Sequence, residues 1–237
     1  MRITIVGAGH AGSAFSLALS RAGHAVALVH HDDVATLPDA DVVLLAVPDD
    51  AIADVAAAIA PSYDRVIAHL AGSRGLDVLS PHPRAASLHP LVPLPEAELG
   101  ARRLVGATYA VAGDPVVAEL VASLDGRLVR VPEDRRAAYH AAAAVAANHL
   151  VALMGSVQAI AEVAGLSLDD FLPLAEAALA DVRMFGPAAA LTGPAARGDM
   201  ATIDAHLAAI PEAERPAYVA LATAALELAE RRAPRPA

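Results

Sequence analysis

The chain of 237 residues contains no cysteine, no lysine and no tryptophan, and only 3% of its residues are aromatic. Without cysteine there is no disulfide, no thiolate nucleophile and no cysteine metal ligand, and no metal site is expected. Without lysine, Schiff-base chemistry and a lysine general acid are excluded, and every basic side chain with a fixed charge is arginine. Scarce aromatic rings argue against stacking on nucleic-acid bases. Histidine therefore remains the natural residue for proton transfer.

Positive charge is also scarce, because 17 basic residues face 27 acidic ones and give a net charge of −10. This balance disfavours a nucleic-acid partner. The N-terminus enters an apolar strand directly, so we expect no signal sequence. The Ala-rich stretch 137–164 is apolar enough to be mistaken for a membrane span, but it contains residues that are costly in lipid, namely His140, Asn148, His149, Gln158 and Glu162. We expect a buried core helix, no membrane partner and a cytoplasmic protein.

The chain has two halves of different texture. Up to about residue 132, short β-branched runs alternate with Ala-rich helical runs, such as 12–22 and 50–60, which predicts a doubly wound, mostly parallel Rossmann sheet. The strand candidates are 2–6, 25–29, 42–47, 65–70, 86–89, 106–112 and 127–131. After Pro132 nothing reads as a strand, so 133–237 is predicted to be an all-helical domain for substrate binding and dimerisation. The Arg- and Pro-rich segment 231–237 is expected to fray.

A glycine motif, Gly7-Ala8-Gly9-His10-Ala11-Gly12, follows the first apolar strand and opens a helix. In this context the G-x-G-x-x-G pattern is typical of dinucleotide binding, whereas alone it is weak. Gly7 permits the tight turn, Gly9 lets the backbone approach the pyrophosphate, and Gly12 lets helix and strand pack closely. The helix start, with His10 and Ala11, then offers free N–H groups to the phosphates.

The end of the second strand bears on the choice between NAD and NADP. An acidic residue there binds the ribose 2′-hydroxyl of NAD and repels the 2′-phosphate of NADP. The first residues after the strand are His30 and His31, which could meet a phosphate, and Asp32 follows at the spacing that an NAD-type acid has. We give the strand-end position more weight and predict NADP, with NAD the less favoured alternative.

Two further β–α junctions are expected to contact the cofactor. Ligands of open α/β sheets lie at the carboxyl ends of the strands. Val47 and Pro48 follow the third strand and could pack against the cofactor, although ordinary loop packing explains them equally well. Gly72 follows the fourth strand in the segment 69–75 and is likewise predicted to contact the cofactor.

His69 and His89 each end a predicted strand on the cofactor side of the sheet. Hydride reduction of a carbonyl leaves negative charge on oxygen, which a donor such as histidine must stabilise and then protonate. We favour His89 for this role, against a merely hydrogen-bonded loop histidine. For His69 we favour the structural interpretation.

His140 and Asn148 lie in the first helix of the second half. At 3.6 residues per turn, positions eight apart are offset by only about 80°, so the two side chains share a broad face. Both are candidate catalytic groups, with Asn148 orienting the substrate. Satisfied polar groups at a domain seam are the alternative, and for His140 the two interpretations carry equal weight.

The segment Leu191-Thr192-Gly193-Pro194-Ala195-Ala196-Arg197-Gly198-Asp199 has the pattern of a helix start. Thr192 is a candidate cap, and Pro194 suits the first turn. A helix start favours an anion, and Arg197 would add a bidentate donor, so Thr192 and Arg197 are predicted to hold a substrate carboxylate. A plain capped turn with Arg197 paired to an acid is the alternative.

These residues together resemble a known family. The motifs GAGHAG (7–12), AVPDDAI (46–52), HLAGSRG (69–75), SLHPL (87–91), YHAAAAVAANHL (139–150) and LTGPAARGD (191–199) are similar to Rossmann reductases of the 6-phosphogluconate dehydrogenase-like superfamily that carry a helical C-terminal domain of formerly unknown function. Some members are an alternative kind of ketopantoate reductase. The resemblance implies NADPH-dependent reduction of 2-dehydropantoate. The better-known ketopantoate reductases use a catalytic lysine, which this chain lacks.

Three hypotheses remain open. The chain is a 2-ketoacid reductase with His89 or His140 as proton donor, another superfamily oxidoreductase acting on a pyrroline-5-carboxylate-like imine or a prephenate-like ring, or a non-catalytic NADPH-binding regulator. The C-terminal helices carry more apolar surface than one such domain can bury against itself, so we expect a homodimer.

Overall fold

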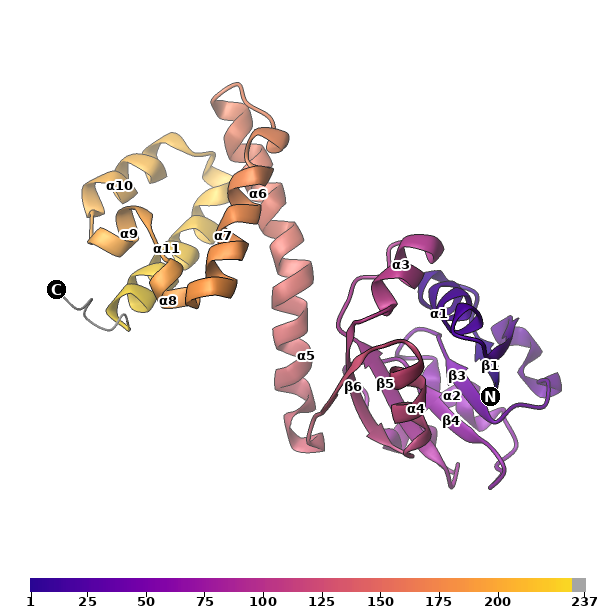
Figure 1. The fold of residues 1–237 in the computed structure, drawn as a ribbon. Coiled ribbons are helices and arrows are strands. Elements are labelled where there is room, and N and C mark those ends of the chain that lie inside the picture. The colour runs from indigo at the N-terminus through magenta and orange to yellow at the C-terminus, as the bar shows by residue number, and fades with distance from the viewer. Residues whose placement is uncertain (232–237) are drawn as a thin grey trace. The chain divides into compact units, whose positions relative to one another are not determined.

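The structure, a computed structural model, describes residues 1–231, so most of the segment 231–237 that was predicted to fray lies outside the described residues. The chain forms two compact units, Met1–Ala147 and Asn148–Ala237. The boundary between them falls within the long helical run after the sheet, later than the predicted residue 132. Figure 1 shows the elements of both units.

The first unit is built on a seven-stranded sheet in the order β2-β1-β3-β4-β5-β6-β7. Its strands are β1 (Arg2–Val6), β2 (Ala25–Val29), β3 (Val42–Leu45), β4 (Val66–His69), β5 (Ala85–Pro90), β6 (Thr108–Gly113) and β7 (Arg127–Arg130). All neighbouring strands are parallel except β5 and β6. The predicted mostly parallel Rossmann sheet is therefore confirmed, and the carboxyl ends of β1 to β5 share one edge.

Alternate residues of the strands enter two separate cores, as the two-residue period of a β-strand requires. Ile3 and Ile5 of β1 pack with residues of α1 (His10–Arg21), α3 (Ala97–Leu104) and α4 (Val116–Ser123) on one face. Val43 and Leu45 of β3 pack on the other face with α2 (Ile52–Ala57) and the short 3-10 helix η2 (Leu76–Leu79). Another 3-10 helix, η1 (His31–Thr36), follows β2. Both faces of the sheet are covered at its centre, so β1, β3 and β4 are almost fully buried, whereas the edge strands β2 and β7 are partly exposed.

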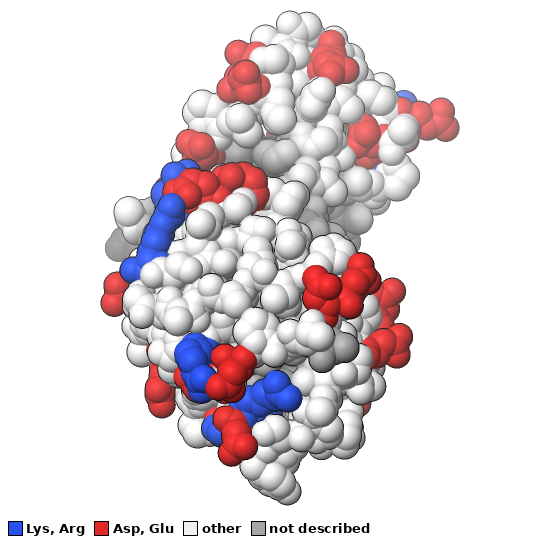
Figure 2. Space-filling view, turned by 90° about the vertical axis from the view of Figure 1, so that its right-hand side faces the viewer, with Lys and Arg blue, Asp and Glu red and all other residues white. Residues whose placement is uncertain are grey.

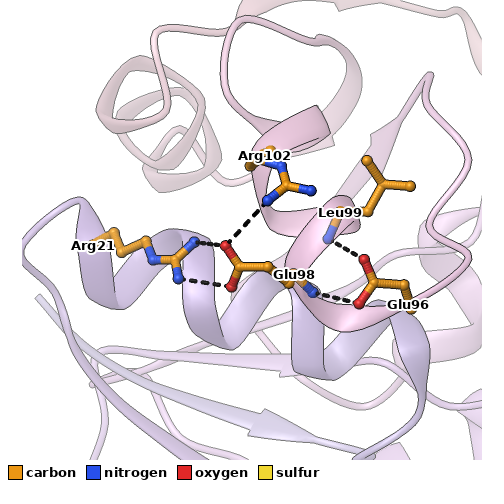
Figure 3. Close-up of polar contacts among 5 residues, drawn as sticks. All are labelled: Arg21, Glu96, Glu98, Leu99 and Arg102. Atoms are coloured by element: carbon orange, nitrogen blue, oxygen red, sulfur yellow. Dashed lines mark hydrogen bonds and ion pairs between the residues drawn. The ribbon is translucent and has the colours of Figure 1, made fainter.

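Helix α1, which begins at the glycine motif, is held by α3 at its far end. Arg21 forms a two-bond ion pair with Glu98 in the first turn of α3, at 3.0 and 2.8 Å, and Arg102 lies 3.6 Å from the same carboxylate (Figure 3). Glu96 caps α3 by accepting from the N–H groups of Glu98 and Leu99. On the face shown in Figure 2, arginines lie beside carboxylates rather than gathering into a basic surface.

A long helical run follows the sheet. It consists of a 3-10 turn (Glu133–Arg135), α5 (Arg136–Ala144), a π-helix (Val145–His149) and α6 (Leu150–Val163). By length and composition the run Glu133–Val163 is apolar enough to cross a membrane, and none of its most apolar 18-residue window is buried within the chain. The prediction of a buried core helix is therefore wrong for a single chain, because other described residues do not cover the most apolar part of this helix.

The remaining helices belong to the second unit. They are η5 (Leu168–Asp170), α7 (Leu172–Phe185), α8 (Pro187–Ala190), α9 (Gly193–Arg197), α10 (Met200–Ala209), η6 (Glu212–Glu214) and α11 (Arg215–Glu230). Between residues 133 and 231 the structure has no strand, as predicted. Many large apolar side chains of this unit are exposed, among them Val151, Val163, Leu174, Leu179, Met184, Phe185, Val219 and Leu221.

Candidate active site

The turn between β1 and α1 is closed so tightly that two of its glycines have no room for a side chain. Gly7 has a φ of +109°, and a Cβ there would lie 2.4 Å from the carbonyl oxygen of Ala46. A Cβ on Gly12 would lie 1.8 Å from the carbonyl oxygen of Gly7. The Gly7 N–H also donates to the Val29 carbonyl at 2.9 Å. These contacts fix where α1 begins relative to β1, β2 and β3.

Gly9 differs from these two glycines, because a Cβ there would meet nothing within 4 Å. Its backbone is extended, with φ −71° and ψ −173°, so the fold itself does not require glycine. The first backbone bond of α1 runs from the Ser13 N–H to the Gly9 carbonyl at 2.9 Å, which leaves the N–H groups of His10, Ala11 and Gly12 free. The first turn has no acidic residue. The helix start therefore suits an anion that lies over Gly9.

His30, His31 and Asp32 form one exposed cluster beyond the end of β2. The His30 Nδ1 lies 3.1 Å and the His31 Nε2 3.3 Å from the Asp32 carboxylate, and the two imidazole rings are 4.4 Å apart. Within residues 1–231 this is also the one group whose ligand atoms could converge on a metal ion, although all three side chains are exposed.

Two histidines end neighbouring strands on the carboxyl edge of the sheet. His69 ends β4 and is fully buried, and its Nε2 hydrogen bonds with the Gly75 carbonyl at 3.0 Å. His89 lies near the end of β5 and is half-buried. Its Nδ1 is 2.5 Å from the Tyr139 hydroxyl of α5, with the two rings edge-to-face at 5.7 Å between centroids. The contact joins the start of α5 to the sheet edge.

His140 completes this cluster together with Gly72. A Cβ on Gly72 would lie 2.7 Å from the His140 Nδ1 and 2.8 Å from the His89 Nε2, so both imidazoles touch the Gly72 backbone. The ring centroids of His89 and His140 are 6.0 Å apart. Among residues 1–231, neither the buried His140 Nδ1 nor the buried His69 Nδ1 has a hydrogen-bond partner. Gly72 is also a predicted cofactor contact, and its close approach to both imidazoles gives a steric reason for glycine at this position.

A buried arginine, Arg136, lies near His69 and His89. Arg136 is 4% exposed. Its Nε lies 3.3 Å from the Glu133 carboxylate, and its Nη2 donates to the Ser87 hydroxyl at 3.5 Å. Ser87 is the β5 residue paired in register with His69. The guanidinium therefore holds the start of α5 against the carboxyl end of β5.

Burial, with a smaller contribution from this positive charge, lowers the pKa values of two of these histidines. Burial, followed by the charge of His140, lowers the pKa of His89 from 6.5 to about 4. Burial also lowers the pKa of His69, and the nearby Arg136 lowers it further. Burial raises the pKa of Tyr139 to about 12. At neutral pH, His89 is thus an uncharged hydrogen-bonding group rather than an acid in its cationic form.

The other predicted contacts in the first unit lie at the same edge. Val47 is half-buried and packs against the core beneath α2, whereas Pro48 is exposed. Asp49 accepts a hydrogen bond from the Ser73 hydroxyl at 2.5 Å, which joins the loop after β3 to the loop after β4.

Asn148, Thr192 and Arg197 belong to the second unit and are all exposed. Asn148 lies in the π-helix Val145–His149, where the wider turn breaks the uniform 3.6-residue spacing from which its shared face with His140 was predicted. Thr192 occupies the N-cap position of α9 without a side-chain cap bond, and Arg197 is the last residue of this five-residue helix. Within residues 1–231, Arg197 forms no ion pair, while Asp199 caps α10 instead.

Sequence reasoning did not select Tyr139 and Arg136, although both contact the cluster. Tyr139 directly precedes His140, and Arg136 lies one helical turn before it, which is the spacing of residues on one helix face. This helical spacing is the signal in the sequence that places these residues near His140. The spacing alone does not show that this face of the helix contacts β5.

The chain is similar to several known proteins. A family model described as "Domain of unknown function (DUF2520)" matches residues 105–225, slightly more than half of the chain. No curated protein matches. The candidate NADP oxidoreductase BF3122 from Bacteroides fragilis has a similar structure, with 21% identity, a TM-score of 0.79, and coverage of 95% of this chain and 98% of that chain.

Two other solved structures are also similar. Protein TM1727 from Thermotoga maritima is 23% identical, with a TM-score of 0.75 and coverage of 97% of this chain and 100% of that one. A reductive aminase from Aspergillus terreus, in complex with NADPH and ethyl levulinate, is 17% identical, with a TM-score of 0.70 and coverage of 95% and 93%. At these identities the likenesses show a shared fold.

The lowered pKa of His89 predicts how stability depends on pH. Between its unfolded pKa of 6.5 and its folded pKa of about 4, the unfolded chain binds more protons than the folded one. Stability contributed by neutral His89 is therefore complete above pH 6.5, falls as the pH drops toward 4, and is lost below. Urea unfolding at pH 7, 5.5 and 4.5 measures the free energy of unfolding. As the pH falls, this free energy should decrease less in His89→Gln than in the wild type. If the free energy of unfolding depended on pH equally in both proteins, the low pKa of His89 would be contradicted.

Proposed function

This chain belongs to the DUF2520 family, and on that premise we propose that it is an NADPH-dependent oxidoreductase that reduces a small carbonyl or imine compound. One observation carries the proposal: the tight glycine turn leaves open space at Gly9, and neutral His89 lies at the same carboxyl edge of the sheet. In open α/β sheets this edge is where ligands bind. The NADP and NADPH named for the similar structures support the choice of cofactor.

The residues at this edge fit a dinucleotide. The open position at Gly9 leaves room for a pyrophosphate, and the free N–H groups of His10, Ala11 and Gly12 would donate to its oxygens. The exposed His30 and His31 would meet the 2′-phosphate. Asp32, paired with both imidazoles, repels that phosphate less than a free carboxylate would. Val47, Pro48 and Gly72 remain the candidate contacts along the remainder of the cofactor.

NADPH bound at this edge would supply the hydride. His89 then acts as a neutral hydrogen-bond donor to the oxygen or nitrogen that gains electrons, a role in which a fixed donor stabilises developing charge. A ketone also needs a proton. Neutral His89 does not supply it readily, so His140 takes this role of the two histidines considered. An iminium substrate arrives protonated and needs hydride alone.

For the substrate we retain two classes. The resemblance of the sequence motifs favours a 2-ketoacid, 2-dehydropantoate first, with Thr192 and Arg197 holding the carboxylate and Asn148 orienting the substrate. The reductive aminase among the similar structures supports a C=N substrate instead. Arg197 is exposed and forms no ion pair within residues 1–231, so its guanidinium is available to a carboxylate.

We also propose a homodimer in which a second copy covers the apolar side chains of the helical unit. Leu174 is 68% and Met184 73% exposed in one chain, and soluble monomers rarely expose many such groups together.

The glycine turn gives a direct test of cofactor binding. Gly9→Val should fold, because nothing lies within 4 Å of its Cβ, yet it should weaken NADPH binding by more than about a hundredfold, since the side chain would occupy the pyrophosphate position. Gly155→Val is the matched control, because Gly155 also has an open Cβ position but lies in α6. Calorimetric titration measures both. Unchanged affinity in a folded Gly9→Val protein would refute the cofactor site.

Arg197→Ala separates the two substrate classes. If the substrate is a 2-ketoacid, the variant should raise KM at least about tenfold and lower kcat, because the carboxylate loses its bidentate partner. NADPH affinity should not change. An imine without a carboxylate should be reduced equally by wild type and variant. Steady-state kinetics with 2-dehydropantoate, pyruvate and 1-pyrroline, an imine that has no carboxylate, provide the comparison. Unchanged ketoacid kinetics would mean that Arg197 is not the clamp.

Oligomeric state is tested by light scattering at micromolar concentration. The wild type should have twice the chain mass of 24.0 kDa, and Leu174→Glu combined with Met184→Glu should shift it toward the monomer. Tyr63→Glu, at a residue 79% exposed in the first unit, should leave the dimer intact. A monomeric wild type would contradict the proposal.

A further inference from the structure

Tyr139 contacts His89 through both its hydroxyl and its ring. Its hydroxyl lies 2.5 Å from the His89 Nδ1, and the edge-to-face packing of the two rings fixes their orientation at an interplanar angle of 88°. Tyr139 is held in turn by its place in α5, whose first residue, Arg136, is anchored to β5 through Ser87. The tyrosine therefore reaches His89 from a fixed element rather than from a loop.

The direction of this hydrogen bond follows from the chemistry of the two groups. A neutral imidazole has one N–H and one nitrogen with a free lone pair, whereas a phenol has an acidic O–H and an oxygen whose lone pair is a poor acceptor. Between a phenol and an imidazole nitrogen, the stronger bond has the phenol as donor. With Nδ1 as acceptor, the ring proton of neutral His89 must lie on Nε2.

The His89 Nε2 lies beside Gly72 and faces the region that His140 also borders. A Cβ on Gly72 would be 2.8 Å from this nitrogen and 2.7 Å from the His140 Nδ1. No protein acceptor hydrogen bonds with the His89 Nε2 within residues 1–231. Its N–H is therefore available to a substrate atom at the carboxyl edge of β5.

We infer that Tyr139 is a positioning residue that fixes His89 in the tautomer with the proton on Nε2, so that this N–H is the donor offered to the reducible oxygen or nitrogen. The assignment of the donor's target rests on the proposed reductase function. The tautomer itself does not, because it depends only on the contact between Tyr139 and His89. Tyr139 donates a hydrogen bond to His89 but does not transfer its proton, since burial raises the pKa of Tyr139 to about 12.

The groups around His89 support a neutral ring. His140, His69 and Arg136 each disfavour its protonation through their charge, and Asp49 alone favours it. Removing the Tyr139 hydroxyl would take away a bond made to the neutral form of His89, so the pKa of His89 should rise. The lost bond would also let the ring exchange between its two tautomers.

The chain contains a matched control for this experiment. His206 and Tyr218 form a second pair of the same geometry, with the His206 Nδ1 2.6 Å from the Tyr218 hydroxyl and edge-to-face rings 5.9 Å apart. This pair lies in α10 and α11 of the helical unit, outside the histidine cluster. Tyr218→Phe removes the same kind of bond without touching His89.

Nitrogen-15 NMR of the full-length protein labelled at histidine provides the test without any substrate. The His89 signals are assigned by their absence in His89→Gln. The wild type should show protonated Nε2 and unprotonated Nδ1 from pH 5 to 8. Tyr139→Phe should show tautomer exchange and a higher His89 pKa, while Tyr218→Phe leaves the His89 signals unchanged. A proton on Nδ1 in the wild type, or the same His89 signals in Tyr139→Phe, would overturn the inference.

Kinetics separate positioning from structure once a substrate is turned over. Tyr139→Phe should lower kcat about tenfold, the value of one net hydrogen bond of about 1.4 kcal/mol, with NADPH affinity unchanged and the acid limb of the pH–rate profile moved to higher pH. A change confined to thermal stability, with kcat and the pH profile intact, would overturn the catalytic part. Absence of turnover in the wild type would instead refute the proposed function and leave the tautomer result standing.

Discussion

Close approach of backbone and side chains at the carboxyl edge of the sheet is the constraint on which the rest of the site depends. Gly12 brings α1 against the Gly7 carbonyl, and Gly72 brings two imidazoles against the chain. A methyl group at either position would force the neighbouring atoms apart. Because Gly7 is fixed against Ala46, the position of the free N–H groups of α1 is set by β1 and β3 together. The open space at Gly9 stands out against this tight packing.

The second determinant is the charge environment of a protein that has no lysine. Its fixed positive charges are arginines, and Arg136 is buried beside the histidines. An arginine does not lose its proton inside a protein, so its charge adds to burial, the main cause, in lowering the pKa values of His69 and His89. A neutral, oriented histidine suits stabilisation of charge that appears during hydride transfer better than it suits donation from a cationic ring. This is why iminium and ketone substrates place different demands on the site.

The sheet could be predicted from the sequence almost completely, because β-branched runs and glycine punctuation are local signals. The glycine motif and the positions of His69 and His89 at strand ends followed from the same pattern. The contacts of Tyr139 and Arg136 could not be predicted, because they join α5 to β5 across about 50 residues of chain, and a single sequence carries no signal for that pairing. The π-helix at Asn148 was missed because helical periodicity assumes 3.6 residues per turn. The apolar surface of Glu133–Val163 was mistaken for core, since composition does not show whether an apolar helix is covered by the rest of its own chain.

Transfer of deuterium from NADPH tests the central claim most directly. The full chain is incubated with NADPH deuterated at the hydride position and, separately, with 2-dehydropantoate, pyruvate and pyrroline-5-carboxylate, and the products are analysed by mass spectrometry. The account predicts a product that carries one deuterium on the former carbonyl or imine carbon, formed by the wild type and lost in Gly9→Val. Tight NADPH binding with no deuterium transferred to any ketoacid or imine would contradict it and would favour a cofactor-binding regulator.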